Sequence, residues 1–188
     1  GNITIDSGSF SLRDGTQLQA LTRGQGNAGN VTVSAFDSVD LAGNASIIST
    51  VEAGGVGKGG NININAASLS LKDSAQLLTV TRAASATQPA GQGDAGNVNV
   101  NVTGAVNIAG EKNGFQSGIR SRVQTGAVGN GGNITINSGS FLLGEGANLS
   151  ASTSGQGNAG NVTVRAKEAV SLVHSAILST VAEGGVGK

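Results

Sequence analysis

The residues best suited to chemistry in this chain of 188 residues are few and isolated. Its only histidine, His174, has no acidic partner that recurs with it, so nothing indicates a general base or a metal ligand. Lys58 follows a glycine-rich stretch, but Gly59-Gly60 comes next, where a phosphate-binding loop needs Ser or Thr. The chain has no cysteine, which excludes thiol catalysis and thiolate metal sites. We therefore predict no catalytic residue, no cofactor and no metal site.

Three acidic residues take equivalent turn positions in alternate units of an internal repeat: Asp14, Asp73 and Glu145. If the units stack like parallel strands, these positions lie about 9–10 Å apart. That separation is too large for the carboxylates to share one metal ion. The glycine-rich turns also lack the Gly-Gly-x-Gly-x-Asp calcium repeat. We interpret the three acids as turn residues with local hydrogen bonds.

The repeat that positions these residues is a Gly-Asn-aliphatic-x-aliphatic motif, which recurs at intervals of 28 to 36 residues. Its asparagines are Asn2, Asn30, Asn61, Asn97, Asn133 and Asn161. We expect them to form a structural ladder at one corner, with each buried amide hydrogen-bonded to those above and below. The preceding glycine either takes a positive φ or allows close backbone approach. We interpret sequences such as Asn2-Ile-Thr4 as part of this ladder rather than as glycosylation sites.

Each unit contains three short segments in which apolar and polar residues alternate, the pattern of β-strands. In the first unit they are 2–6, 9–12 and 17–22, separated by Gly or Asp-Gly steps. The inward positions agree in all units, and the third segment gives the column Leu18, Ile47, Leu77, Ile119, Leu149 and Ile177. The sequence therefore predicts an all-β fold, a right-handed parallel β-helix with three strands per rung and about six rungs.

The turns that close the units alternate between two types, represented by 24–30 and 54–61. The true repeat is thus a pair of rungs, with boundaries at residues 1–59, 60–131 and 132–188. We expect one continuous β-helix over residues 1–188. We also expect it to be a segment of a longer chain, because the absence of Met leaves any initiator or signal peptide outside it.

The middle repeat carries two insertions, around residues 83–90 and 111–115. Insertions in a solenoid emerge as loops, and loops are frequent binding sites, with neutral length variation as the alternative. The candidate contact residues are Gln88, Pro89, Lys112, Asn113 and Phe115. A partly apolar outer face of the third strands, which can pack on a partner, is also expected. Its members are Leu21, Ile48, Leu78 and Leu178, alongside Arg23, Arg82, Arg120 and Arg122.

The charges of the chain are balanced and dispersed. There are 11 basic and 11 acidic residues, and the only aromatic residues are four phenylalanines. Without a basic stripe or an aromatic stacking platform, we predict no nucleic-acid partner.

Two longer phrases are distinctive: Gly132-Asn-Ile-Thr-Ile-Asn-Ser-Gly-Ser140 and Gly146-Ala-Asn-Leu-Ser-Ala-Ser-Thr-Ser-Gly-Gln-Gly-Asn-Ala-Gly-Asn-Val-Thr-Val164. They resemble the repeats of filamentous-haemagglutinin-like exoproteins, in the form typical of the large cyanobacterial members. The resemblance covers essentially the whole chain. It implies a β-helical fibre or adhesin at the cell surface, exported by two-partner secretion through an outer-membrane pore partner. Cell-surface glycans are then candidate partners.

We therefore expect a non-enzymatic structural or adhesive shaft of a secreted, extracellular fibre. Its partners are further rungs of the same chain or end-to-end copies. The alternative is a polysaccharide-binding or polysaccharide-degrading β-helix module, whose degrading form needs Asp, Lys or Arg clustered on adjacent rungs of one face. An ice-binding solenoid is disfavoured, because Asn63 and Asn99 interrupt its outward threonine column.

Overall fold

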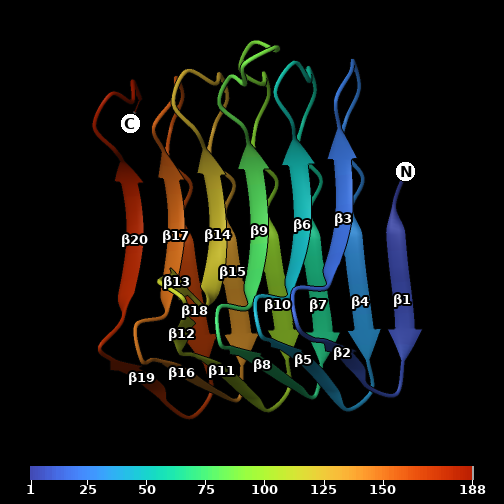
Figure 1. The fold of residues 1–188 in the computed structure, drawn as a ribbon. Coiled ribbons are helices and arrows are strands. Elements are labelled where there is room, and N and C mark those ends of the chain that lie inside the picture. Colours follow the sequence, from blue (N-terminus) through green and yellow to red (C-terminus); the bar gives the residue numbers. More distant parts are fainter. Residues whose placement is uncertain (188) are drawn as a thin grey trace.

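The fold is a parallel β-helix, seen in a computed structural model that describes residues 1–187 (Figure 1). Within this range there are twenty strands, and eighteen of them form three six-stranded parallel sheets. One strand from each sheet makes a rung, so the prediction of an all-β solenoid with three strands per rung and about six rungs is confirmed. Residues 1–187 contain no helix of the length and apolarity that a membrane span requires.

The three sheets enclose a narrow interior, with the third sheet facing the viewer in Figure 1. The first sheet contains β1 (Ile3–Ser7), β4 (Val31–Ala35), β7 (Ile62–Ala66), β10 (Val98–Val102), β15 (Ile134–Ser138) and β18 (Val162–Ala166). The second contains β2 (Phe10–Leu12), β5 (Ser38–Ala42), β8 (Ser68–Lys72), β11 (Ala105–Ala109), β16 (Ser140–Gly144) and β19 (Val170–Val173). The third contains β3 (Gln17–Thr22), β6 (Ser46–Val51), β9 (Gln76–Thr81), β14 (Gly118–Val123), β17 (Asn148–Thr153) and β20 (Ala176–Val181).

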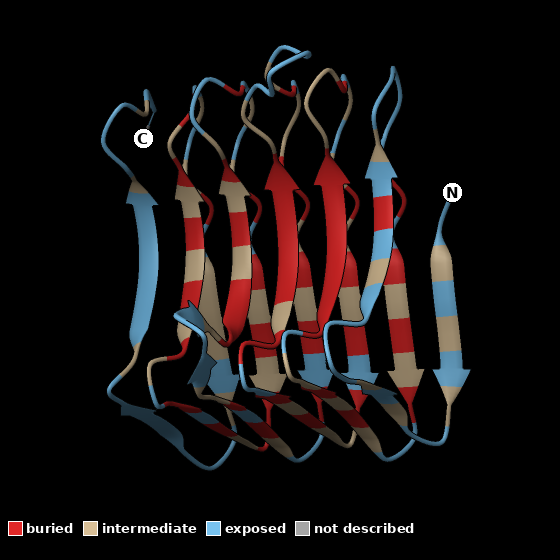
Figure 2. Ribbon diagram, viewed as in Figure 1, coloured by how far each residue is buried: buried red, intermediate tan, exposed pale blue. Residues whose placement is uncertain are grey.

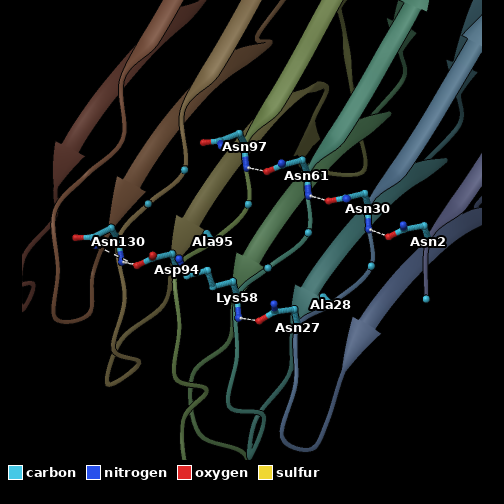
Figure 3. Close-up of a pocket in the computed structure, with 17 residues that line it drawn as sticks. Asn2, Asn27, Ala28, Asn30, Lys58, Asn61, Asp94, Ala95, Asn97 and Asn130 are labelled. Atoms are coloured by element: carbon cyan, nitrogen blue, oxygen red, sulfur yellow. Dashed lines mark hydrogen bonds between the residues drawn. The ribbon is translucent and has the colours of Figure 1, made fainter.

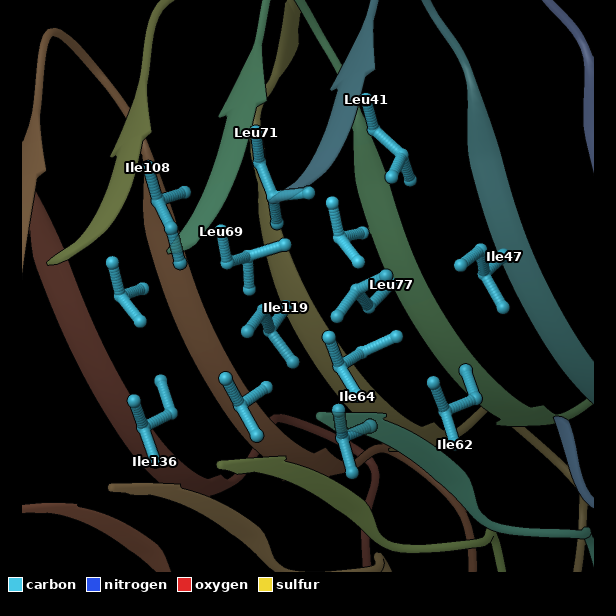
Figure 4. Close-up of a cluster of buried hydrophobic side chains, with 14 of the residues drawn as sticks. Leu41, Ile47, Ile62, Ile64, Leu69, Leu71, Leu77, Ile108, Ile119 and Ile136 are labelled. Carbon is cyan, nitrogen blue, oxygen red and sulfur yellow. The ribbon is translucent and has the colours of Figure 1, made fainter. Parts of the chain in front are cut away.

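Successive rungs pair in register, so equivalent residues stack directly on one another. The first sheet gives the column Ile3, Val31, Ile62, Val98, Ile134 and Val162. The third gives the predicted column Leu18, Ile47, Leu77, Ile119, Leu149 and Ile177. These columns fill the interior, and their members in the inner rungs are almost completely excluded from solvent (Figure 4). Burial of these aliphatic side chains, rung against rung, is the main source of stability.

A second inward column of the third sheet consists of small residues, and its hydroxyls bind backbone groups of the glycines before the ladder asparagines. It comprises Ala20, Ser49, Thr79, Ser121, Ala151 and Ser179. The Ser49 hydroxyl donates to the carbonyl of Gly29 and accepts from the N–H of Gly60. The side chains of this column are small because they pack against backbone. Hydroxyls recur in it because buried backbone groups need hydrogen-bond partners.

The glycine that precedes each ladder asparagine from Asn30 onwards is required by close backbone approach. Gly29, Gly60 and Gly96 do not have a positive φ. A Cβ added to Gly60 would lie 2.0 Å from the carbonyl oxygen of Gly29 in the rung before. Of the two explanations open from the sequence, the close approach therefore holds.

The turn from the second to the third strand of each rung uses left-handed backbone. Asp14, Asp73 and Glu145 have φ values of 53°, 53° and 51°, and His174 takes the same place in rung six with a φ of 47°. The N–H of Glu145 donates to the carbonyl of Val173 in the next rung. The three acids are therefore turn residues that stack along the axis through their backbone.

Candidate functional site: the outer face of the third sheet

Two outward columns run across the third sheet, between the positions of the two insertions. The first column is Gln19, Ile48, Leu78, Arg120, Ser150 and Leu178. The second is Leu21, Thr50, Val80, Arg122, Ser152 and Thr180. The expected outward apolar residues thus belong to two registers, with Leu21 in one and Ile48, Leu78 and Leu178 in the other.

The centre of this face is buried, which corrects the expectation of an exposed apolar patch. Figure 2 shows β6 and β9 buried along both faces. Ile48 and Leu78 are only 8% and 7% exposed, and with Val80 they form a cluster separate from the central core. Alternation correctly places these side chains outside the sheet, but it carries no information on what covers them. Leu21 and Leu178, nearer the ends of the stack, are exposed.

One insertion is a structured β-hairpin rather than an open loop. Strands β12 (Glu111–Lys112) and β13 (Phe115–Gln116) pair antiparallel across Asn113-Gly114, both of which have positive φ. Asn-Gly flanked by strand residues is a strong hairpin signal in the sequence. The hairpin is held by Ser74, whose hydroxyl accepts from the N–H of Lys112 and faces the carbonyls of Lys112 and Phe115.

The contact residues predicted on the hairpin are all exposed, and Phe115 is 63% exposed. Phe115 lines a shallow hollow together with Ile48, Leu78 and Gln76 of the third sheet. The hairpin therefore brings an aromatic side chain to the lower edge of the outward apolar cluster.

The other insertion lies beyond the opposite ends of the strands. Gln88 and Pro89 are exposed on it, and the carbonyl of Pro89 accepts from the N–H of Gly54 in the rung below. The N–H of Ala83 donates to the side-chain oxygen of Gln124 in the rung above. The structure does not bring the two predicted contact groups together. It places them at opposite ends of the same face.

Three arginines lie on this face, and one of them forms an ion pair. Arg82 pairs with Glu52 at 3.3 Å. Arg120 donates to Oδ1 of Asn148 at 2.9 Å and to the carbonyl of Gln116 at 3.4 Å. Burial lowers the pKa of Arg122 below its ordinary value, and the nearby charge of Arg82 lowers it further. Burial and the charge of Arg122 lower the pKa of Arg120 in the same way.

Arg122 differs from the other two arginines because nothing in residues 1–187 pairs with it. Its Nε is buried without a hydrogen-bond partner, and no carboxylate lies within ion-pair distance. A polar hollow opens beside its side chain, lined by Ala83, Gln124, Thr125, Ser152 and Ser154. The arrangement can accept an anionic group that approaches from solvent.

The predicted asparagine column makes a ladder of a different kind from the one expected. The backbone N–H of each asparagine from Asn30 to Asn161 donates to Oδ1 of the asparagine one rung earlier at 2.8–2.9 Å; Figure 3 shows the bonds from Asn2 to Asn97. The side chains are exposed or half-buried, so the expectation of buried amides is wrong. Amide-to-amide bonds occur instead on the outside of the first sheet, among Asn65, Asn101 and Asn137.

A second, parallel ladder lies three residues earlier, and the sequence interpretation missed it (Figure 3). The N–H of Lys58 donates to Oδ1 of Asn27, the N–H of Asn130 to Oδ1 of Asp94, and the N–H of Asn158 to Oδ1 of Asn130. The two ladders border one shallow groove along the turn. The signal was present as Asn or Asp three positions before the motif asparagine in four of the units.

Two further observations concern residues outside this face. Phe36, between β4 and β5, is 85% exposed and was not singled out from the sequence. The feature of the sequence that could have drawn attention to Phe36 is the rarity of aromatic residues in the chain. Across residues 1–187, no three His, Asp or Glu side chains come close enough to hold a metal ion.

Comparison with family models, curated proteins and solved structures found no match to this chain.

Proposed function

We propose that this protein is a non-enzymatic structural and adhesive shaft of a secreted fibre at the cell surface. The observation that carries the proposal is the in-register stacking of the inward columns through the inner rungs. Val39, Leu69, Val106 and Phe141 stack in one column, and each is at most 1% exposed. Each rung buries its inward side chains against the rungs on either side of it, which is the arrangement of an extended shaft.

The alternation of turn types indicates which kind of rung fits there. Gln25, Val56, Gln92, Val128, Gln156 and Val186 form one column of bridges along the turns. Glutamine and valine alternate in it, so a rung of the glutamine type, such as rung one, matches the turn that contains Val186. The partners in the proposal are therefore further rungs of the same chain, or end-to-end copies of it. Extracellular location and export through an outer-membrane pore follow the resemblance of the repeats to exoprotein repeats.

The test is whether the 188-residue protein assembles along its axis. Sedimentation velocity across a range of concentrations should show growth of the particles with concentration. Electron cryo-microscopy of the assembled material should show filaments with an axial spacing of about 4.8 Å. A particle that stays monomeric at high concentration, with no filaments, would contradict the proposal.

A further inference from the structure

We infer that the hollow beside Arg122 is a binding site for an acidic polysaccharide, one that carries carboxylate or sulfate groups. The inference adds an adhesive site to the proposed shaft and does not depend on its assembly. It rests on an arginine with no partner, a polar hollow at that arginine, and two insertions that frame the same face.

Burying part of the Arg122 guanidinium costs free energy, and no group of residues 1–187 pairs with it to offset that cost. Arg122 is the last residue but one of β14, with Arg120 two residues before it on the same face and Arg82 in the preceding rung. Its Nε is buried and unpaired, and the carboxylate of Glu52 is bound to Arg82. A guanidinium offers a planar fork that matches the two oxygens of a carboxylate or sulfate. The half-buried side chain of Arg122 lines the hollow, so an anionic group from solvent can approach the exposed part of its guanidinium there.

The surroundings of Arg122 indicate a saccharide. The residues that line the hollow include Thr125, Ser152 and Ser154, which carry hydroxyls, and Gln124, which carries an amide; such groups hydrogen-bond to sugar hydroxyls. It is open rather than enclosed, as an extended chain requires, and it shares the outer face with the hollow beneath Phe115. The insertions at 83–90 and 111–116 stand at either end of this face.

A control can test whether a polyanion binds through the overall charge of the protein rather than through Arg122. Because the net charge is zero, a polyanion has no overall attraction to the molecule and depends on the local arginines. Arg165, exposed on the outside of the first sheet, offers a matched control. Arg122→Gln and Arg165→Gln remove the same charge from two different faces.

Binding to the 188-residue protein would be measured by isothermal titration calorimetry with polygalacturonate, dextran sulfate, neutral dextran and polyglutamate. We expect at least one of the two anionic polysaccharides to bind, and the pair distinguishes carboxylate from sulfate recognition. Arg122→Gln should weaken that binding roughly ten- to a hundred-fold, since a charged hydrogen bond is lost. Arg165→Gln should change it by less than about twofold.

A second variant keeps the test independent of any effect of Arg122 on folding. Thr125→Glu adds a carboxylate on an exposed turn beside the hollow and should abolish binding while the circular dichroism spectrum is unchanged. The inference is overturned if neither polysaccharide binds, if Arg165→Gln weakens binding as much as Arg122→Gln, or if polyglutamate binds as tightly as the polysaccharides. Sedimentation of the same variants should show unaltered assembly, which separates this result from the test of the shaft.

Discussion

At the scale of single residues, the ladder asparagines act through one oxygen atom each. Oδ1 of Asn61 accepts from the N–H of Asn97, and the N–H of Asn61 donates to Oδ1 of Asn30. The Nδ2 group takes no part in these bonds, so a carboxylate can serve as well as an amide. The second ladder already contains such a case, because Asp94 accepts from the N–H of Asn130.

This geometry predicts different outcomes for two substitutions at one position. Asn61→Ala should lower the free energy of unfolding by about 1 kcal/mol, since the N–H of Asn97 loses its acceptor. Asn61→Asp retains the oxygen and should stay within about 0.5 kcal/mol of the parent. Urea denaturation of both variants checks this. Equal losses would show that the amide nitrogen, and not the oxygen, matters.

Arg122 leads to the opposite prediction, a gain in stability on removal. Burial and the charge of Arg82 disfavour its charged form, so Arg122→Gln should raise the free energy of unfolding, by at most about 1 kcal/mol for a half-buried group. A base whose pKa is lowered on folding carries this penalty at every pH below its folded pKa. The gain should therefore be constant between roughly pH 5 and pH 8. Denaturation at several pH values checks it, with Arg165→Gln as the control that should change little.

At the scale of the elements, strand positions and register followed from the sequence because every rung repeats the same inward columns. Leu18, Ile47 and Leu77 occupy equivalent places and stack as expected. The burial of Ile48 and Leu78 did not follow, because alternation assigns a face but not the cover over it. The anchoring of the hairpin by Ser74 depends on contacts with Lys112 and Phe115, which lie 38 and 41 positions later in the chain. No local pattern encodes such contacts.

That Arg122 lacks a partner was equally hidden from the sequence. The position of Arg122 on the outer face was clear from the alternation in β14. The absence of a carboxylate opposite it depends on which residues of adjacent rungs lie beside it, and on Glu52 being engaged by Arg82. Such information requires the stacked rungs.

The glycine turn can be tested by adding a single methyl group. Gly60→Ala places a Cβ about 2.0 Å from the carbonyl oxygen of Gly29, so the two rungs must separate at that corner. We expect a loss of about 3 kcal/mol or more in the free energy of unfolding. Gly24→Ala meets no atom within 4 Å and should change stability by less than about 0.5 kcal/mol. Thermal and urea denaturation compare the two, and a tolerated Gly60→Ala would mean that the turns are not held in close contact.

At the scale of the whole molecule, stability is distributed over nearest-neighbour rungs, so an end rung differs from an inner rung only in having one covered side. Ile177 is 38% exposed at the last rung, whereas Leu149 beneath it is fully buried. Association of this end with rung one of another copy would cover the columns and pair the free backbone edges at once. The affinity should then depend on the inward side chains of the end rung and not on its outward ones.

Two lysine substitutions on β19 separate these contributions. Leu172→Lys places a charge in the inward column of the end rung, where a further rung would have to bury it, so concentration-dependent assembly should be lost. Ser171→Lys adds the same charge one residue earlier, on the outward side of the same strand, and should leave assembly intact. Sedimentation velocity distinguishes the two variants. If both variants assemble like the parent, association does not use the end rung. If both fail to assemble, the effect is one of net charge. Either outcome would contradict growth along the axis.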